Sequence, residues 1–298
     1  MRDRVVMMAR VKDEARWIGR CLASVWPVAA TVVLWDDGST DGTGHAAVQA
    51  VPGPSRFHFD HGAVVIVESL SSDVGPCALH LLASLFTRPV AGREVERVNE
   101  IRDKNMLWAY VKVATAGDVI LCLDGDEALS RRAQHVLPEL IAWMVDDPVG
   151  ADILVLPFVY LWDADDRQRV DAIYGWRDAE RTVKRLAFPR VFSLTRSTPL
   201  DRFNQCFRWE GNPGGFHCGS IPNEAYWPRG RGNEPLRLYA DAPVIHFGYR
   251  DAADRRRKYE FYNRIDPHNQ TEGEYRHIIG EPNVHAPGPV ELAPWEDV

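Results

Sequence analysis

Three acidic clusters follow short apolar runs in this 298-residue sequence: Lys12-Asp13-Glu14, Asp36-Asp37 and Asp124-Gly125-Asp126-Glu127. If the apolar runs are parallel strands, all three clusters lie at the carboxyl edge of one sheet. Carboxylates gathered at one edge repel each other unless a cation, or a hydrogen-bond donor such as a nucleobase imino group, offsets them. An Asp-Gly turn is common by itself, so the prediction of such a site depends on the three clusters together.

The first half of the chain alternates predicted strands and helices, which favours a mostly parallel sheet with helices on its faces. Apolar residues at helical spacing predict helices near residues 18–25 and 98–111. Residues 52–60 are typical of a loop, and residues 69–93 fit no single element. The predicted strands are Val5–Ala9, Thr31–Trp35, Ala63–Val67 and Val119–Leu123.

The second half differs in composition, with polar and Gly-rich segments between its predicted strands. Such segments suit a region that shapes a substrate site. Strands are predicted at Ile153–Leu161 and Val191–Leu194, and Val244-Ile245 leads into His246. A charged helix is predicted over Asp251–Arg264, followed by a tail rich in Pro, Gly and His.

The composition is that of a globular protein with a sizeable core, 45% hydrophobic and 26% charged. The net charge of −7 would repel nucleic acid and anionic membranes, so a nucleic-acid partner is disfavoured. Five scattered cysteines without a C-x-x-C pair indicate reduced thiols. No apolar run approaches the ~18 residues of a transmembrane segment, and we expect a cytoplasmic protein. Whether it forms a homodimer is left open.

Several motifs together resemble the opening of the family 2 glycosyltransferases. They are Val11-Lys12-Asp13-Glu14 with Arg20–Val25, then Trp35–Thr43, and then Asn105 followed by Gly117–Glu127, in that order and within residues 4–128. His246 is similar to the third metal-site residue of many GT-A enzymes. Asp13 departs from the family by standing where Asn is usual. The interval from Asp37 to Asp124 is also longer than usual, which an insertion near residues 69–95 would explain.

The resemblance implies a single GT-A domain: a Rossmann-like α/β fold with a mixed, mainly parallel sheet flanked by helices. Residues 1–128 would form the half that binds the nucleotide sugar. Residues 129–248 would form the acceptor half, and residues 249–298 a C-terminal helix and tail. The expected donor is a nucleoside-diphosphate sugar, with a UDP-sugar favoured. The acceptor, whether glycan, lipid, protein or small molecule, is not identified.

The resemblance also implies roles for individual residues around the donor. Asp37 would accept a hydrogen bond from the nucleobase, and the loop from Lys12 to Glu14 would close over it. Arg102 or Lys104 would lie near the base or the phosphates. The implied donor-binding residues are Val11, Asp13, Glu14, Asp37, Arg102, Lys104, Asp124 and Gly125.

A divalent cation, Mn²⁺ or Mg²⁺, is the cofactor that the resemblance implies. Its ligands would be Asp124, Asp126 and His246, with Asp126 essential for catalysis and Asp124 also facing the ribose. Such ions take few carboxylates and let phosphate oxygens and waters complete an octahedron, and the histidine favours Mn²⁺ somewhat.

An inverting transfer needs a general base for the acceptor hydroxyl, and Glu210 is our choice, with Asp201 and Glu224 as rivals. Its neighbour Trp209 would be a core residue or would stack on a sugar ring. The run Arg255–Lys258 is typical of a solvated helix face, with contact to a phosphate or a lipid head group as the alternative.

Other functions compete with this reading. The loop after the first strand has neither the Gly-rich sequence of a nucleotidyltransferase nor the G-x-G-x-x-G of a dinucleotide-dependent oxidoreductase. A retaining glycosyltransferase and a non-catalytic protein that binds nucleotide sugars both remain open.

Overall fold

The computed structural model describes residues 1–298 except 61–63, 72–74, 84–99, 116, 118, 148–150, 194–208, 211–217, 223–235, 267–274 and 285. The strands of its large central sheet are β1 (Val5–Val11), β2 (Thr31–Asp36), β3 (Ser55–Asp60), β4 (Val64–Ser69), β5 (Ala78–Ala83), β6 (Val119–Cys122), β7 (Glu127–Leu129), β8 (Ile153–Tyr160), β12 (Ala187–Ser193), β13 (Arg237–Tyr239) and β14 (Val244–His246). Two small pairs lie apart from it: β9 (Arg167–Arg169) with β15 (Leu292–Pro294), and β10 (Trp176–Arg177) with β11 (Val183–Lys184). The α-helices are α1 (Ile18–Val25), α2 (Thr43–Gln49), α3 (Glu100–Ala114), α4 (Arg131–Asp146) and α7 (Ala252–Ile265).

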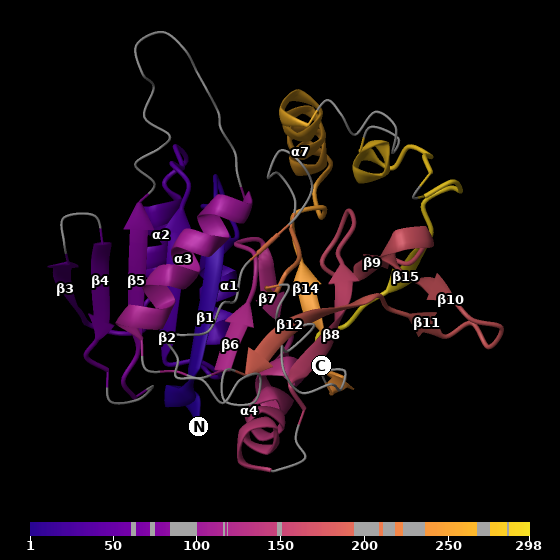
Figure 1. Ribbon diagram of the computed structural model, residues 1–298. Helices are drawn as coiled ribbons and strands as arrows, with labels where there is room; N and C mark the ends of the chain where they lie inside the picture. Colours follow the sequence, from indigo (N-terminus) through magenta and orange to yellow (C-terminus); the bar gives the residue numbers. More distant parts are fainter. Residues whose placement is uncertain are drawn as a thin grey trace, which may run out of the picture.

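The central sheet is mixed, with the order β3-β4-β5-β2-β1-β6-β12-β8-β14-β7 and β13 paired to β8. Its middle strands β5, β2, β1 and β6 are parallel neighbours. Strands β4, β12 and β7 run against all the others, so most of the strands point the same way. The predicted fold class, a mixed and mainly parallel sheet flanked by helices, is confirmed (Figure 1).

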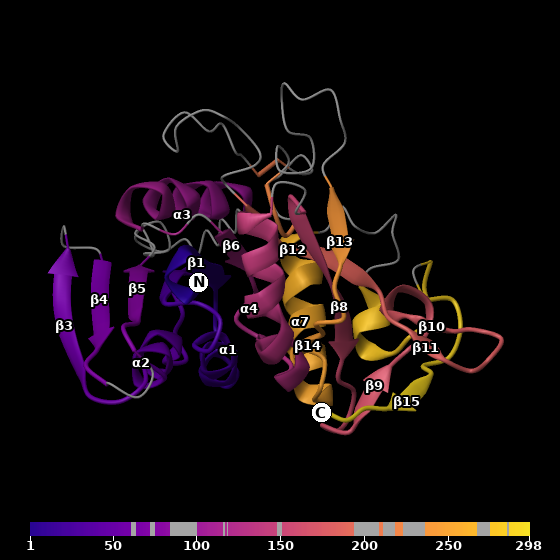
Figure 2. The same ribbon diagram turned by 90° about the horizontal axis from the view of Figure 1, so that it is seen from below.

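Strand β1 is buried on both faces, as expected for the centre of a parallel sheet. Met7 and Ala9 face a core that includes residues of α1, α2 and α4. Val6 and Met8 face a second core that includes residues of α3. The helices therefore cover the sheet from two sides, with α3 opposite α1 and α2 (Figure 2).

The first helix forms for the reason that the spacing indicated. Ile18, Leu22 and Val25 lie on one face of α1, and all three are fully buried against the sheet. Helix α4 is capped at its N-terminus by Ser130, whose Oγ accepts a hydrogen bond from the Ala133 amide at 3.0 Å. Its apolar face then packs beside α1 in the same core.

The prediction of a loop over residues 52–60 is wrong in its second half, because Ser55–Asp60 forms β3. Strand β3 is at the edge of the sheet and pairs only with β4, so its side chains are largely in solvent and Phe57 is 52% exposed. An edge strand tolerates the polar residues that argued for a loop. The unplaced stretch 69–93 contains β5, while Ala63, Val98 and Leu194 lie outside the described residues.

Strands β1, β2, β6 and β14 all end at the same edge of the sheet, which brings the loops that follow them together. Helix α7 lies over that edge (Figure 1). Among the described helices, none is long and apolar enough to cross a membrane.

Candidate active site

A cavity of about 500 Å³ opens at this edge of the sheet, beneath α7. Its walls come from the loop after β1, the turn after β6, the end of β14 and one side of α7. Residues lining it are Arg10, Lys12, Asp13, Glu14, Glu100, Asp124, Gly125, Asp126, His246, Arg257, Lys258, Glu260, Phe261, Tyr262 and Arg264. The sequence-predicted residues Asp13, Glu14, Asp124, Gly125, Asp126 and His246 are among them.

The loop after β1 is fastened to the turn after β2 by hydrogen bonds. The Asp13 amide donates to Ser39 Oγ at 2.9 Å, and Asp13 Oδ1 accepts from the Thr40 amide at 2.8 Å. The Glu14 amide donates to Thr43 Oγ1 at 2.8 Å. Asp13 has a φ of 53°, a left-handed conformation that Asp and Asn adopt more readily than most residues. Asp13 therefore shapes the loop by joining two segments.

Asp37 lies at the end of β2 but is 1% exposed and does not line the cavity. Its Oδ2 accepts from the Arg10 guanidinium, whose Nε also donates to Asp103 Oδ2 at 3.0 Å. Burial raises the pKa of Asp37, and Arg10 opposes the rise. Its Oδ1 is buried without a hydrogen-bond partner among the described residues. Arg10 thus lies between Asp37 and the cavity, and the predicted contact of Asp37 with a nucleobase would require Arg10 to move.

The two predicted phosphate contacts on α3 point to protein partners. Arg102 pairs with Asp103 at 2.6 Å. Lys104 pairs with Glu100 at 2.6 Å and is buried. Neither Arg102 nor Lys104 lines the cavity, so in this structure both side chains support α3 and its surroundings.

The turn after β6 is built around Glu127. Glu127 Oε2 accepts from the Asp124 amide at 2.9 Å, and Glu127 Oε1 pairs with Arg190 at 2.5 Å. Arg190 also lies 3.8 Å from the Asp124 carboxylate, whose side chain is 46% exposed. Gly125 is closely packed, since an added Cβ would lie 2.9 Å from Val11 Cγ1. This close packing holds Val11 against the turn.

Asp126 is a buried carboxylate that contacts two other elements of the site. Its Oδ2 pairs with Lys258 of α7 and lies 3.5 Å from His246 Nε2 at the end of β14. Burial would raise the pKa of Asp126, but Lys258 and then His246 outweigh it, and the pKa lies well below its usual range. Asp126 is therefore ionised at neutral pH.

His246 is neutral at pH 7, because burial lowers its pKa to about 4. Its ring packs on Tyr249 with centroids 4.5 Å apart. Its Nδ1 is buried and has no hydrogen-bond partner among the described residues. A neutral imidazole beside an ionised carboxylate can ligate a metal.

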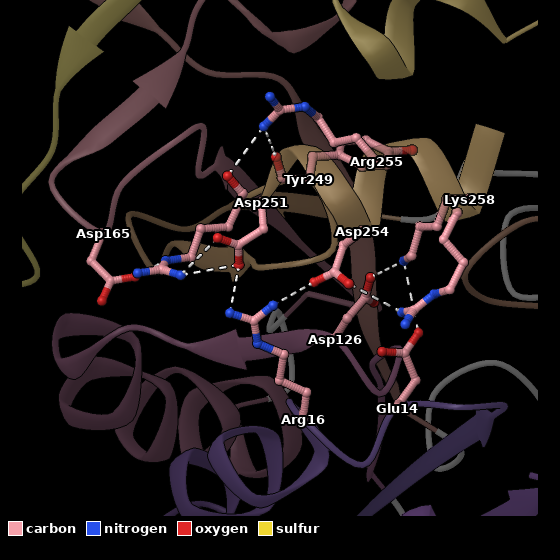
Figure 3. A network of polar contacts seen from close by, with 11 residues as sticks. Glu14, Arg16, Asp126, Asp165, Tyr249, Asp251, Asp254, Arg255 and Lys258 are labelled. Carbon is pink, nitrogen blue, oxygen red and sulfur yellow. Dashed lines mark hydrogen bonds and ion pairs between the residues drawn. The ribbon is translucent and has the colours of Figure 1, made fainter. Parts of the chain in front are cut away.

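Glu14 completes the group of carboxylates around Lys258. Its Oε1 lies 3.7 Å from Lys258 Nζ, and its Oε2 is buried without a hydrogen-bond partner among the described residues (Figure 3). Burial raises the pKa of Glu14 to about 8, with Lys258 opposing and Asp126 adding to the rise. Lys258 thus contacts two acidic side chains, Glu14 and Asp126.

For a divalent cation the described residues offer Asp126, in the turn after β6, and His246, at the end of β14, whose side chains approach each other. Around no point do three His, Cys, Asp or Glu side chains of the described chain gather as a metal site. Asp124, the third predicted ligand, is turned toward Arg190. Because Mg²⁺ is often held by one or two protein ligands together with substrate phosphates and waters, the pair fits a cation bound jointly with a diphosphate.

The predicted general base is not part of the cavity wall. Glu210 is exposed, and its neighbour Trp209 is 1% exposed in the core against Trp108. Asn105 fixes Trp209 by two hydrogen bonds, of 2.9 and 3.0 Å, to its backbone. Trp209 is thus a core residue. The rivals Asp201 and Glu224 lie outside the described residues.

Sequence reasoning missed several residues of the site, among them Arg10, Arg190, Gly248 and Lys258. Arg10 is two residues before Lys12, so its position beside the acidic turn could have been inferred. Lys258 belongs to a basic run that gave no sign of which member turns inward. A Cβ at Gly248 would overlap both Asp126 Oδ2 and Lys258 Nζ, a constraint that sequence alone does not reveal.

Comparison with known proteins finds neither a matching family model nor a matching curated protein. Solved structures align with this chain at low sequence identity. Residues 1–349 of TarS from S. aureus align over 93% of this chain and 69% of that chain, at 10% identity and a TM-score of 0.46. Glucosyl-3-phosphoglycerate synthase from M. tuberculosis aligns over 52% of this chain and 44% of that chain, at 18% identity and a TM-score of 0.27. At these values the likenesses define neither the donor nor the reaction of this chain.

The close approach at Gly248 makes a stability prediction. Gly248→Ala should force Asp126 and Lys258 apart and lower the free energy of unfolding by about 1–3 kcal/mol, the usual cost of overpacking. Urea unfolding followed by circular dichroism measures this change. Gly19→Ala is the matched control, because an added Cβ there meets nothing within 4 Å. In the α1 helix it should raise stability by about 0.5–1 kcal/mol. Equal stability of Gly248→Ala and the parent would contradict the close contact.

Proposed function

We propose that this chain is a metal-dependent glycosyltransferase of the GT-A type that uses a nucleoside-diphosphate sugar, with a UDP-sugar as the favoured donor. The observation that carries the proposal is the meeting of ionised Asp126 with neutral His246, 3.5 Å apart, in the wall of the cavity at the carboxyl edge of the sheet. A pair of this kind suits a cation shared with a diphosphate. The basic side chains Arg10, Lys12 and Arg257 line the same cavity and suit an anionic donor.

Donor binding is proposed to use residues 1–128. Asp126 and His246 would hold the divalent cation, Mn²⁺ or Mg²⁺, with Asp124 facing the ribose. The cation would supply positive charge beside the diphosphate as it leaves. Lys12, whose Nζ donates to the Asp37 carbonyl at 3.0 Å, and Arg10 would orient the nucleotide from the other wall.

The transfer itself is proposed to invert the anomeric centre. The acceptor oxygen forms its bond to the anomeric carbon while the bond from that carbon to the diphosphate oxygen breaks. Glu210, which lies outside the cavity wall in this structure, is the proposed general base that would take the hydroxyl proton. Residues 129–248 are proposed as the acceptor half, and residues 249–298 as the helix and tail. Phe261 and Tyr262 of α7 add aromatic surface to the cavity, which suits a sugar ring.

The first test of this function is the dependence of UDP binding on metal. With Mn²⁺ present the parent should bind UDP, and removal of the metal by EDTA should weaken binding at least tenfold, because the diphosphate would then face Asp126 and Asp124 without a divalent counter-ion. Asp126→Asn should weaken binding similarly when Mn²⁺ is present. Isothermal titration calorimetry measures both effects.

The matched control for this test is Asp146→Asn, which removes a surface carboxylate of α4 that pairs with Arg4 far from the cavity. It should leave UDP affinity unchanged. UDP binding that is equally tight with EDTA and in Asp126→Asn would rule out the metal-dependent reading.

The second test concerns the general base. Glu210→Gln should lower kcat by about 10²- to 10⁴-fold, the usual contribution of a positioned base, while UDP affinity stays at the parental value. Steady-state turnover of a donor found by calorimetry gives kcat, and proton NMR of the first product gives its anomeric configuration. A parental kcat would move the role to another carboxylate. A product that retains the donor's configuration would overturn the inverting mechanism.

A further inference from the structure

Lys258 stands apart from the other members of its basic run. Arg256 and Arg257 are exposed on α7, whereas the Lys258 side chain is only 15% exposed and reaches the sheet edge (Figure 3). Arg255 is also buried, but it donates to the Tyr249 carbonyl at 2.8 Å and pairs with Asp163. Only Lys258, of these four, pairs with the carboxylates of the cavity.

Lys258 pairs with the carboxylate oxygen that a metal would bind. Its Nζ pairs with Oδ2 of Asp126, and the same oxygen faces His246 Nε2 at 3.5 Å. A divalent cation between Asp126 and His246 would bind this oxygen at roughly 2.0–2.2 Å. The ammonium group and the metal carry like charges, so they repel each other at one carboxylate oxygen. Binding of the cation at Asp126 Oδ2 therefore favours the departure of Lys258.

The surroundings allow the ammonium group to leave without moving its helix. Arg16 holds the start of α7 by pairing with Asp251 at 2.8 Å and with Asp254 at 3.0 Å. The lysine stem has four flexible carbons, and Lys258 itself lines the cavity in which the diphosphate is proposed to lie. Its ammonium group can therefore turn from the carboxylate to a phosphate oxygen.

We propose that Lys258 is an exchangeable counter-ion that neutralises Asp126 in the empty site and moves to the donor diphosphate when the metal binds. This inference rests on the proposed function. It makes metal and nucleotide bind cooperatively, since the metal alone must displace a lysine that gains no new partner. The diphosphate provides that partner. By linkage, the nucleotide raises metal affinity by the same factor as the metal raises nucleotide affinity.

The experiment measures Mn²⁺ affinity by calorimetry, with and without UDP, in the parent and in Lys258→Met. Without UDP, Lys258→Met should bind Mn²⁺ more tightly than the parent, on the order of 5- to 150-fold, the usual range of coupling between sites. The factor by which UDP tightens Mn²⁺ binding should shrink in the variant. Lys258→Gln is a second neutral replacement, used if the methionine variant fails to fold, and should behave in the same way.

Two charge controls accompany these variants. Lys258→Arg keeps the positive charge and should retain the weak Mn²⁺ binding of the parent. Arg256→Met removes a charge from the exposed side of the same helix and should not change Mn²⁺ affinity. A folded neutral variant with Mn²⁺ affinity equal to or below the parental value overturns the exchange. A parent that binds neither Mn²⁺ nor UDP overturns the proposed function as well, so the two failures are distinguishable.

Discussion

The repulsion among carboxylates at one sheet edge is the constraint on which the rest of this structure depends. Glu14 lies in the loop after β1, Asp124 and Asp126 lie in the turn after β6, and Glu127 begins β7, and the strand order brings all four to that edge. Two like charges 4 Å apart repel by about 4 kcal/mol at an effective dielectric constant of 20. A buried carboxylate that loses its partner typically costs a further 3–5 kcal/mol. The fold therefore has to deliver cations to this edge.

It does so from two directions. Arg190 reaches Glu127 and Asp124 from β12, inside the sheet, where its guanidinium also packs on the Phe158 ring at 4.7 Å. Lys258 reaches Asp126 and Glu14 from α7, above the sheet. Arg190 is buried between strands and is fixed, whereas Lys258 lines a cavity and is free to change partner. The position of α7 is thus as much a part of the site as the loops beneath it.

The sequence predicted the frame of this site well because the frame depends on local patterns. Apolar runs identified β1, β2, β6 and β14, and a parallel arrangement was enough to bring the clusters that follow them to one edge. The prediction was wrong for β3, because an edge strand in contact with solvent has the polar composition of a loop. The long interval after Asp37, attributed to an insertion near residues 69–95, contains strand β5, which lies between β4 and β2 in the sheet.

The partners of the predicted residues were harder to foresee. Asp37 was predicted as a site residue. Its pairing with Arg10 was not predicted, because it depends on how deeply the neighbouring strands β1 and β2 are buried. Lys258 could not be separated from Arg255, Arg256 and Arg257, because the inward face of a charged helix is set by the surface on which it docks. Side-chain direction follows from tertiary packing, and no periodicity in this run revealed it.

The pairing of β7 with β14 has a consequence for protein design. His246 is directly opposite Glu127 in this antiparallel ladder, and the Phe247 amide donates to the Asp126 carbonyl at 2.8 Å. The separation of Asp126 and His246 is therefore fixed by main-chain hydrogen bonds between neighbouring strands, although the two residues are far apart in the sequence. A carboxylate and an imidazole held in this way form a local motif that two neighbouring strands define. Transplanting two short strands with a glycine two positions after the histidine would carry the backbone spacing of the pair into an unrelated sheet.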